Sequence, residues 1–454
     1  MLISKSPADG RVIAEYQETS PAQIATDIET ASELQHDWET QPLAERARPM
    51  MRLAELLEEN REDLAVLMAE EMGKPVAQGR GEAEKCAWVC RHYAENAERI
   101  LADHAIETER TKSYVAYRPL GVVLAVMPWN FPLWQVYRFL APALMAGNAG
   151  ILKHASNVTG CALEIDRLAV EAGFPDGLFR SVVLPSSRVD EILEHPAVVA
   201  ATLTGSDPAG RAVASKAGSL LKKTVLELGG SDPYLVLADA DLELAAATCA
   251  SSRLINGGQS CIAAKRFIVE EPVVERFTEL MAAGLTGAVM GDPLNPETTL
   301  GPMARFDLRD ELHDQVRRSV DAGAELVMGG EIPDLSGAFY PPTLLAGVVE
   351  GMAVYHEETF GPVAAVIAAA DLDEAVRIAN DTEFGLGAAI FTADTALGEA
   401  VARDRLQAGA TFVNSFVASD PRLPFGGIKM SGYGRELSDL GMREFLNAKT
   451  VVVA

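Results

Sequence analysis

Hydrophobic positions in the first hundred residues recur every three or four residues, the period of an amphipathic helix. The pattern covers residues 21–38 and 42–71 and resumes over 81–100. The stop Met72-Gly73-Lys74-Pro75 divides it, because glycine and proline are typical of helix ends. Residues 106–118 then alternate apolar and polar positions. The chain is therefore expected to open with helices and to continue into an extended, partly exposed segment.

From residue 121 the pattern changes to short apolar runs that alternate with helical stretches. Wholly apolar runs of this kind are typical of strands that are buried on both faces. Strands are expected at 121–127, 149–153, 179–184, 197–203, 234–237, 266–269, 363–368 and 411–414. Helices are expected at 159–172, 241–254, 272–290 and 373–380. The alternation predicts an α/β fold with mainly parallel sheets, in two halves that meet near Glu227.

Composition limits the classes of partner. The chain has 454 residues, 48% of them hydrophobic, and a formal net charge of −26. Nucleic acid and anionic membranes are poor partners for such a chain, because both need a basic face. Residues 1–16 lack the apolar core of a signal peptide, and no apolar run reaches the roughly 18 residues of a membrane span. The five cysteines form no CxxC pair, so free thiols in a reducing cytoplasm are expected.

Cys261 differs from the other cysteines in its neighbours. It ends the stretch Ile-Asn-Gly-Gly-Gln-Ser-Cys, residues 255–261. Buried structural cysteines usually have apolar neighbours, whereas glycine allows another molecule to approach the backbone closely. The stretch by itself is compatible with a structural cysteine as well as with a nucleophile.

Two further stretches carry candidate chemistry, each with an ordinary structural alternative. Asn130, in Pro-Trp-Asn-Phe-Pro, follows an apolar strand, where open α/β sheets bind ligands. Its carboxamide could donate to an oxyanion, or simply form a turn before a helix. Glu227 lies between two leucines and before two glycines. Partial burial would raise its pKa and suit a general base, although an acid at a strand edge has the same pattern.

Three loops are candidate ligand contacts. Residues 204–210, Thr-Gly-Ser-Asp-Pro-Ala-Gly, open a helix and could bind phosphate through free N–H groups, although they are not a GxGxxG fingerprint. Residues 357–363 combine two glutamates with Phe360, which suits a ribose and a flat ring, or a simple acidic turn. Residues 424–432 are rich in glycine and could be an ordinary packed loop.

Taken together, these motifs resemble the aldehyde dehydrogenase superfamily. PWNFP, LELGG, GQSC, EETFGPV and PFGGIKMSGYGRE occur in the family's order and span essentially the whole chain. LKHASN, LELGGSDP, GPMARFDLRDELHDQV and SFVASD are similar to the short bacterial-type succinate-semialdehyde dehydrogenases. The resemblance implies a Rossmann-like NAD(P)-binding domain in residues 1–105 and 119–227 and an α/β catalytic domain in 228–414. Residues 106–118 and 434–454 would be β segments for homodimer or homotetramer formation.

The resemblance also assigns catalytic roles. Cys261 would attack the aldehyde as a thiolate and form a thiohemiacetal and then a thioester. Asn130 and the Cys261 N–H would hold the oxyanion. Glu227 would activate the water that hydrolyses the thioester. Gly257 and Gly258 would make room on both sides of the sulfur. No cluster has metal-ligand spacing, so no metal is expected.

The implied cofactor is NADP or NAD, with NADP expected to be preferred because of one position. Many NAD-preferring relatives have a glutamate where this chain has Ser156, and its charge would repel a 2′-phosphate. Lys153 would meet the adenosine ribose nearby. The remaining cofactor contacts implied by the family are Trp129, Gly205, Ser206, Glu358 and Phe360.

The implied substrate is succinic semialdehyde, with Arg138 and Ser419 on its carboxylate. Guanidinium suits a carboxylate because it binds both oxygens, although a solvated helix arginine is the ordinary alternative. Two features differ from the expected pattern: some related enzymes have a second arginine where this chain has Ile255, and Asp420 is a poor neighbour for an anion. Arg253 is close in sequence but is expected to face elsewhere.

Three alternatives remain open from the sequence. The same chemistry could serve a broad range of short or aromatic aldehydes, with Arg138 incidental. A hydrolytic cysteine enzyme would need a histidine near the thiol, and no histidine lies in a recognisable partner motif. A non-catalytic protein that kept the fold is disfavoured by the joint presence of Cys261, Glu227 and Asn130.

Overall fold

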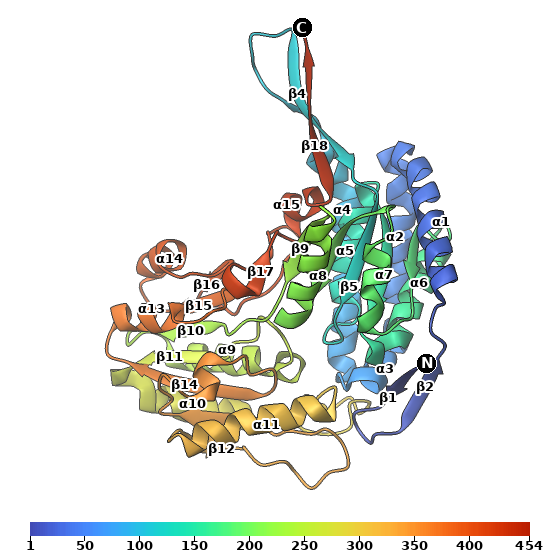
Figure 1. Cartoon of the computed structure of the whole chain (residues 1–454). Coiled ribbons are helices and arrows are strands. Elements are labelled where there is room, and N and C mark those ends of the chain that lie inside the picture. Colours follow the sequence, from blue (N-terminus) through green and yellow to red (C-terminus); the bar gives the residue numbers. More distant parts are fainter.

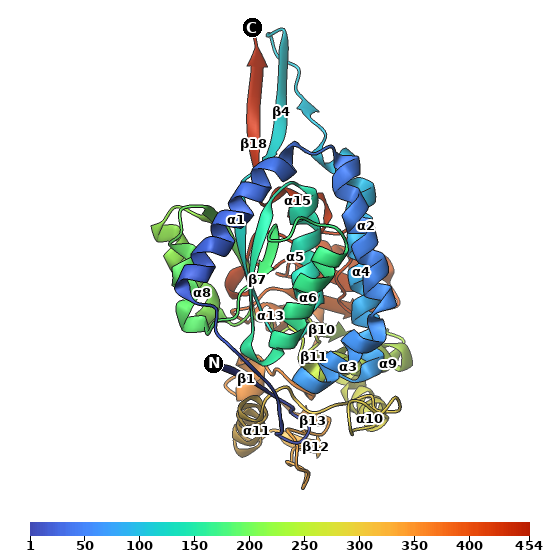
Figure 2. The same ribbon diagram turned by 90° about the vertical axis from the view of Figure 1, so that its right-hand side faces the viewer.

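The computed structural model describes residues 1–454, and its first hundred residues form helices around one sheet. These are α1 (Pro21–Thr40), α2 (Leu43–Glu59), α3 (Arg61–Met72) and α4 (Val76–Leu101). Figure 2 shows α1, α2 and α4 along the outside of this half of the molecule. The single helix predicted over 42–71 is wrong, because Asn60 ends α2 by donating from its backbone N–H and its side chain to the Leu56 carbonyl. The predicted stop is confirmed, since Gly73 closes α3 at a φ of 78°.

The first sheet has the order β17-β9-β8-β5-β6-β7 and is parallel except for β17. Its strands are β5 (Val122–Met127), β6 (Ala149–His154), β7 (Phe179–Ser181), β8 (Val198–Thr204), β9 (Lys223–Glu227) and β17 (Gly432–Tyr433). Its helices are α5 (Trp134–Met145), α6 (Thr159–Glu171), α7 (Val189–Leu193), α8 (Asp207–Ser219) and α15 (Ser438–Arg443). β7 is shorter than the predicted strand over 179–184, because the Val183 N–H donates to Thr19 instead of to a strand.

The second sheet has the order β12-β13-β14-β11-β10-β15-β16, and only β12 is antiparallel. Its strands are β10 (Pro233–Val236), β11 (Arg266–Glu270), β12 (Glu325–Met328), β13 (Thr343–Ala346), β14 (Val363–Ala369), β15 (Gly387–Phe391) and β16 (Ala410–Val413). Its helices are α9 (Leu242–Leu254), α10 (Val274–Thr286), α11 (Phe306–Asp321), α12 (Ala353–His356), α13 (Leu372–Asn380) and α14 (Thr395–Asp404).

Both sheets are buried on their two faces, which confirms the predicted α/β class. Every residue of β6, β10 and β15 is buried. One apolar core surrounds the first sheet, and two further cores lie on opposite faces of the second. Strands that are buried on both faces in this way are typical of parallel sheets covered by helices on two sides. No helix is both long and apolar enough to cross a bilayer.

A third, small sheet forms an arm that extends from the body (Figure 1). It contains β3 (His104–Ala105), β4 (Lys112–Pro119) and β18 (Leu446–Val453), in the order β18-β4-β3. β18 pairs along its whole length with β4 of the same chain, so its inner edge is occupied and its outer edge has no strand partner. A hairpin of β1 (Leu2–Lys5) and β2 (Val12–Tyr16) makes up the fourth sheet.

Candidate active site

Cys261 lies at the end of a sharply turned segment. The 3-10 turn Ile255–Gly258 precedes it, and Gly257 and Gly258 have φ values of 63° and 75°. A Cβ on Gly258 would lie 2.1 Å from the carbonyl oxygen of Gly361. The expectation that these glycines make room beside the sulfur is therefore wrong. They allow the turn and the contact with the Gly361 backbone, and neither lines a cavity.

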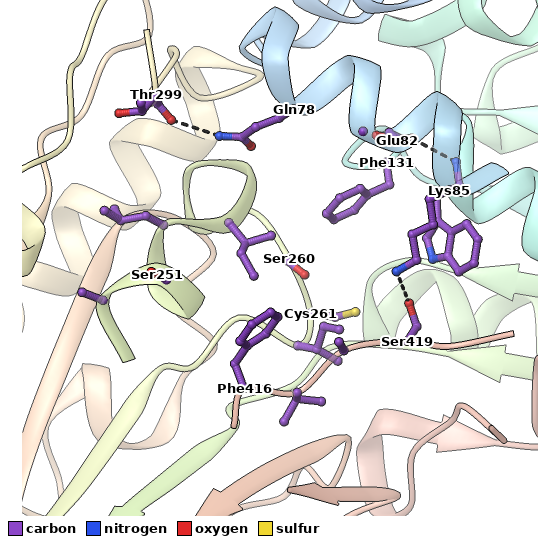
Figure 3. Close-up of a pocket in the computed structure, with 18 of the residues that line it drawn as sticks. Gln78, Glu82, Lys85, Phe131, Ser251, Ser260, Cys261, Thr299, Phe416 and Ser419 are labelled. Carbon is purple, nitrogen blue, oxygen red and sulfur yellow. Dashed lines mark hydrogen bonds between the residues drawn. The ribbon is translucent and has the colours of Figure 1, made fainter. Parts of the chain in front are cut away.

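The half-buried Cys261 side chain lines two cavities at once. One, of about 760 Å³, contains Gln78, Glu82 and Lys85 of α4 and is called the α4 cavity here (Figure 3). The other, of about 610 Å³, lies at the carboxyl ends of β5 and β8 and is called the strand-end cavity. A group bound in one cavity and a group bound in the other can thus both reach the sulfur.

Asn130 is hydrogen bonded to the segment that carries Cys261. Its Nδ2 donates to the Gln259 carbonyl at 3.1 Å, and its own carbonyl accepts from Asn256 Nδ2 at 2.7 Å. The buried Asn130 side chain lines the strand-end cavity, and its Oδ1 has no hydrogen-bond partner. Since an amide nitrogen has two hydrogens, one remains for a ligand beside Cys261.

A buried ion pair that sequence reasoning missed holds the Asn130 turn. Lys74 pairs with Glu82, whose Oε1 also accepts the N–H groups of Leu133 at 2.8 Å and Trp134 at 2.9 Å, where α5 begins. Lys74 Nζ lies 4.0 Å from the centre of the Phe131 ring. Lys74 is visible in the sequence only as part of a helix stop, so its role depends on contacts that the pattern does not encode.

Glu227 ends β9 and is not directed into either cavity. Its side chain is buried, and neither carboxylate oxygen has a hydrogen-bond partner. A Cβ on Gly426 would lie 2.7 Å from Oε1, so the carboxylate faces that loop. Burial and the nearby Glu436 raise the Glu227 pKa well above its usual range, against the opposing effect of Arg138 and Arg435.

Both positive and negative side chains lie close enough to Cys261 to affect the pKa of its thiol. Burial raises the pKa of the Cys261 thiol to about 12, although Arg138 and Lys265 act in the opposite direction. Lys265 Nζ donates to the carbonyls of Ser260, Cys261 and Ala263 at 2.8–3.2 Å and lies 3.5 Å from Glu358 Oε1. This buried lysine fixes the backbone that carries the sulfur, a second role that the sequence did not reveal.

The strand-end cavity collects most of the predicted cofactor residues: Trp129, Gly205, Ser206, Glu358 and Phe360. The rings of Trp129 and Phe360 meet edge to face at 5.7 Å. Ser206 precedes α8 and makes no side-chain cap, so the first N–H groups of the helix are free to bind an anion.

Lys153 and Ser156 lie at the same sheet edge but do not line this cavity. Lys153, on β6, pairs in register with Val126 of β5, the strand that leads into the Trp129 turn. Ser156 begins the 3-10 turn that follows β6. Burial lowers the Lys153 pKa to about 8. A buried cation beside the cavity and the free N–H groups of α8 fit an anionic nucleotide along this edge.

Arg138 and Ser419 both line the α4 cavity together with Cys261. The Arg138 guanidinium is already engaged, because its Nε pairs with the buried Glu436 and its Nη2 donates to Thr204 at 3.3 Å. Lys85 Nζ donates to Ser419 Oγ at 2.8 Å. Sequence reasoning missed both Glu436 and Lys85.

Three residues close in sequence to Cys261 and Ser419 bear on the substrate site: Arg253, Ile255 and Asp420. Arg253 is fully buried and donates to the Gly258 carbonyl at 2.6 Å, so it faces away from the cavity as expected. Ile255 lines the α4 cavity, whereas Asp420 pairs with Arg422 outside it.

No histidine lines the α4 cavity, and His356, which lines the strand-end cavity, accepts from the Gly351 N–H. A cysteine–histidine hydrolase therefore has no support. No group of three or more His, Cys, Asp or Glu is arranged to hold a metal ion.

Comparisons with known proteins agree with this geometry. The model of the aldehyde dehydrogenase family matches residues 2–451. A probable NADP(+) succinate-semialdehyde dehydrogenase of Synechocystis is 46% identical over 99% of both chains. The NADP(+) succinate-semialdehyde dehydrogenase of Mycobacterium avium is 48% identical over 98% of this chain and 95% of its own.

Solved structures show the same fold. Succinic semialdehyde dehydrogenase from Streptococcus pyogenes in complex with NADP+ is 37% identical, covers both chains completely and superposes with a TM-score of 0.97. An NADP-dependent enzyme of E. coli is 33% identical, with a TM-score of 0.97 over all of this chain and 94% of its own.

Proposed function

The chain belongs to the aldehyde dehydrogenase family, and from that membership we propose that it oxidises succinic semialdehyde to succinate with NADP. The observation that carries the proposal is the position of Cys261 between the α4 cavity and the strand-end cavity. The aldehyde enters the α4 cavity, where cationic side chains face it, and the cofactor lies in the strand-end cavity. The broad-specificity alternative is not favoured, because the relatives are succinate-semialdehyde dehydrogenases.

Cys261 is the proposed nucleophile. Its thiolate adds to the aldehyde carbon and gives a thiohemiacetal. The oxyanion accepts from the free Nδ2 hydrogen of Asn130 and from the Cys261 N–H, which makes no backbone hydrogen bond. Each such donor typically contributes about 2.7–4 kcal/mol to the transition state. Burial raises the pKa of the Cys261 thiol to about 12. The nearby cations must therefore stabilise the thiolate, and the two donors must stabilise the oxyanion that it forms.

Glu227 is the proposed base for thioester hydrolysis. Its raised pKa makes the ionised carboxylate a stronger base, and burial is the main cause of the shift. The side chain has to rotate from the Gly426 loop toward Cys261 to act on a water molecule. Since neither of its oxygens is hydrogen bonded, the rotation breaks no hydrogen bond.

The cofactor residues fit NADP, which supplies the hydride acceptor when it is bound. Gly205, Ser206 and the first turn of α8 would hold the pyrophosphate, and Glu358, Phe360 and Trp129 would contact the nicotinamide ribose and ring. Lys153 and Ser156, at the carboxyl end of β6, would meet the adenosine ribose. The absence of a carboxylate at Ser156 removes the repulsion that would exclude a 2′-phosphate.

Arg138 and Ser419 are the proposed contacts of the substrate carboxylate, because both line the cavity that contains Cys261. Arg138 Nη1 makes no hydrogen bond with the protein, so it is free to donate even though Nε and Nη2 are engaged.

The deciding experiment is steady-state kcat/KM for succinic semialdehyde and for butanal, each with NADP and with NAD, followed by reduced-nicotinamide absorbance. A strong preference for the semialdehyde with NADP is expected. Equal rates on both aldehydes would leave a general aldehyde dehydrogenase, and no reduction with any pair would refute the dehydrogenase assignment.

The wider organisation is also a proposal. Residues 1–105 and 119–227 would bind the cofactor and 228–414 would carry the nucleophile, which is supported by the passage of the chain from the first sheet to the second after β9. The segments 106–118 and 434–454 would join subunits into a homodimer or homotetramer, since the outer edge of β18 has no strand partner. Light scattering after size exclusion would give the subunit number.

The five unpaired cysteines support a cytoplasmic location.

A further inference from the structure

We propose that Lys85 of α4 is the cation that gives the site its selectivity for aldehydes with a terminal carboxylate. This inference rests on the proposed function. Lys85 lines the α4 cavity together with Cys261, and its Nζ donates to Ser419 Oγ at 2.8 Å. The ammonium also lies 4.4 Å from the centre of the Trp134 ring. Figure 3 shows Lys85 and Ser419 on the side of the cavity that also holds the Cys261 sulfur.

The other charged groups around the cavity are already paired. Arg138 is neutralised by Glu436. Glu82 pairs with Lys74, and Asp420 pairs with Arg422. Lys85 has no carboxylate within 4.0 Å, so its hydroxyl partner leaves two of its three donors free. It is the one unbalanced positive charge that faces the cavity, in a chain whose overall charge is strongly negative.

The environment of Lys85 favours an incoming anion. Burial, and next the positive charge of Arg138, lower its pKa to about 8. The ammonium is therefore mostly charged at pH 7 but poorly solvated, a state that a carboxylate partner relieves. Trp134 packs on the ammonium and limits its access to water, which strengthens a charge-assisted hydrogen bond.

The shape of the substrate agrees with this assignment. A four-carbon semialdehyde carries its carboxylate only a few bonds from the aldehyde, so the recognising group must share a cavity with the sulfur. Lys85 and Ser419 meet that requirement as a pair, since the hydroxyl that accepts from the lysine can donate its own proton to the carboxylate. Lys85 is thus a specificity-determining residue, and it makes no direct contact with the reacting carbon.

The test compares Lys85→Met, Lys85→Arg and Lys5→Met, with kcat/KM measured for succinic semialdehyde and for butanal. Lys5 is an exposed lysine of β1 and gives a matched loss of one charge. Lys85→Met should lower the semialdehyde-to-butanal ratio about 10- to 150-fold through KM, the range of a hydrogen bond between charged groups. Lys85→Arg should restore most of the ratio, and Lys5→Met should match the unmodified protein.

The pH profile of the same ratio supplies a second readout. The ratio should fall as pH rises through about 8, because Lys85 then loses its proton, and it should stay level in Lys85→Arg. The ratio cancels the titration of Cys261, which both aldehydes require. If the unmodified protein prefers the semialdehyde and Lys85→Met keeps that preference, or loses both activities equally, the Lys85 inference is overturned. If the unmodified protein shows no preference, the proposed substrate fails together with it.

Discussion

Replacing Arg138 is the obvious test of the substrate site, but the structure predicts that the change is mainly a stability event. The side chains of Arg138 and Glu436 are 2% and 6% exposed and pair with one another. Arg138→Met would leave the Glu436 carboxylate buried without its cation. Removing one partner of a buried ion pair typically costs about 3–5 kcal/mol, whereas replacing both is often neutral. Arg138→Met/Glu436→Gln should therefore be more stable than Arg138→Met.

The size of the effect follows from the chain length. An unfolding entropy of about 2.1 cal/mol/K per residue over 454 residues gives roughly 1 °C of Tm per kcal/mol, if the chain unfolds as one unit. Arg138→Met should thus lower Tm by about 3–5 °C in fluorimetric melts at pH 8, and the double variant should recover most of that loss. The semialdehyde activity that the stable double variant loses, relative to the unmodified protein, would then measure the contribution of the Arg138–Glu436 pair to catalysis without the loss of stability.

The pH dependence has a definite sign. Burial raises the folded-state pKa of Glu436, and Arg138 opposes that shift. Without Arg138 the pKa rises further, so the stability of the variant is highest below the unfolded pKa and is lost as pH increases toward the folded value. The Tm difference should be smaller at pH 5.5 than at pH 8. A single variant as stable as the double variant at pH 8 would refute the buried-charge reasoning.

Three further changes test the proposed chemistry. Glu227→Gln should keep a rapid burst of NADPH but lower steady-state turnover, because the thioester forms and is not hydrolysed; stopped-flow absorbance measures both phases, and loss of the burst would contradict a role confined to hydrolysis. Asn130→Ala should lower kcat about 10²- to 10³-fold with little change in NADP affinity, measured by fluorescence titration, and an effect on KM alone would argue against oxyanion binding. Ser156→Glu should move the ratio of kcat/KM for NADP over NAD at least tenfold toward NAD, and an unchanged ratio would remove Ser156 as the cause of NADP acceptance.

Much of the fold follows from local pattern. Runs such as 121–127 are apolar at every position, which is typical of a strand covered on two faces. The break at Asn60 was missed because the apolar period continues on both sides of it, while the cap depends on a side-chain hydrogen bond to Leu56. The strand β9 was missed because Lys223 and Thr224 interrupt its apolar run.

The candidate site could be predicted where one short motif supplies the group, and not where two distant segments must meet. Cys261 and Asn130 stand out through their immediate neighbours, and their predicted roles depend on the order of five motifs along the chain. The pairing of Arg138 with Glu436, nearly 300 residues later, has no local signal, and neither has the contact of Lys85 with Ser419. Both pairs form because α4, α5 and the last segment of the chain converge on one cavity.

The arm joins strands that are made at very different times. β4 is synthesised early, but its partner β18 comes after every other strand in the chain. Until β18 arrives, one edge of β4 is bare and open to wrong pairing. Any subunit contact through this arm therefore has to wait for a finished chain, and the late segment that closes the arm also brings Glu436 to Arg138. The pairing that closes the arm and the pairing that neutralises Arg138 therefore both depend on the same late stretch of polypeptide.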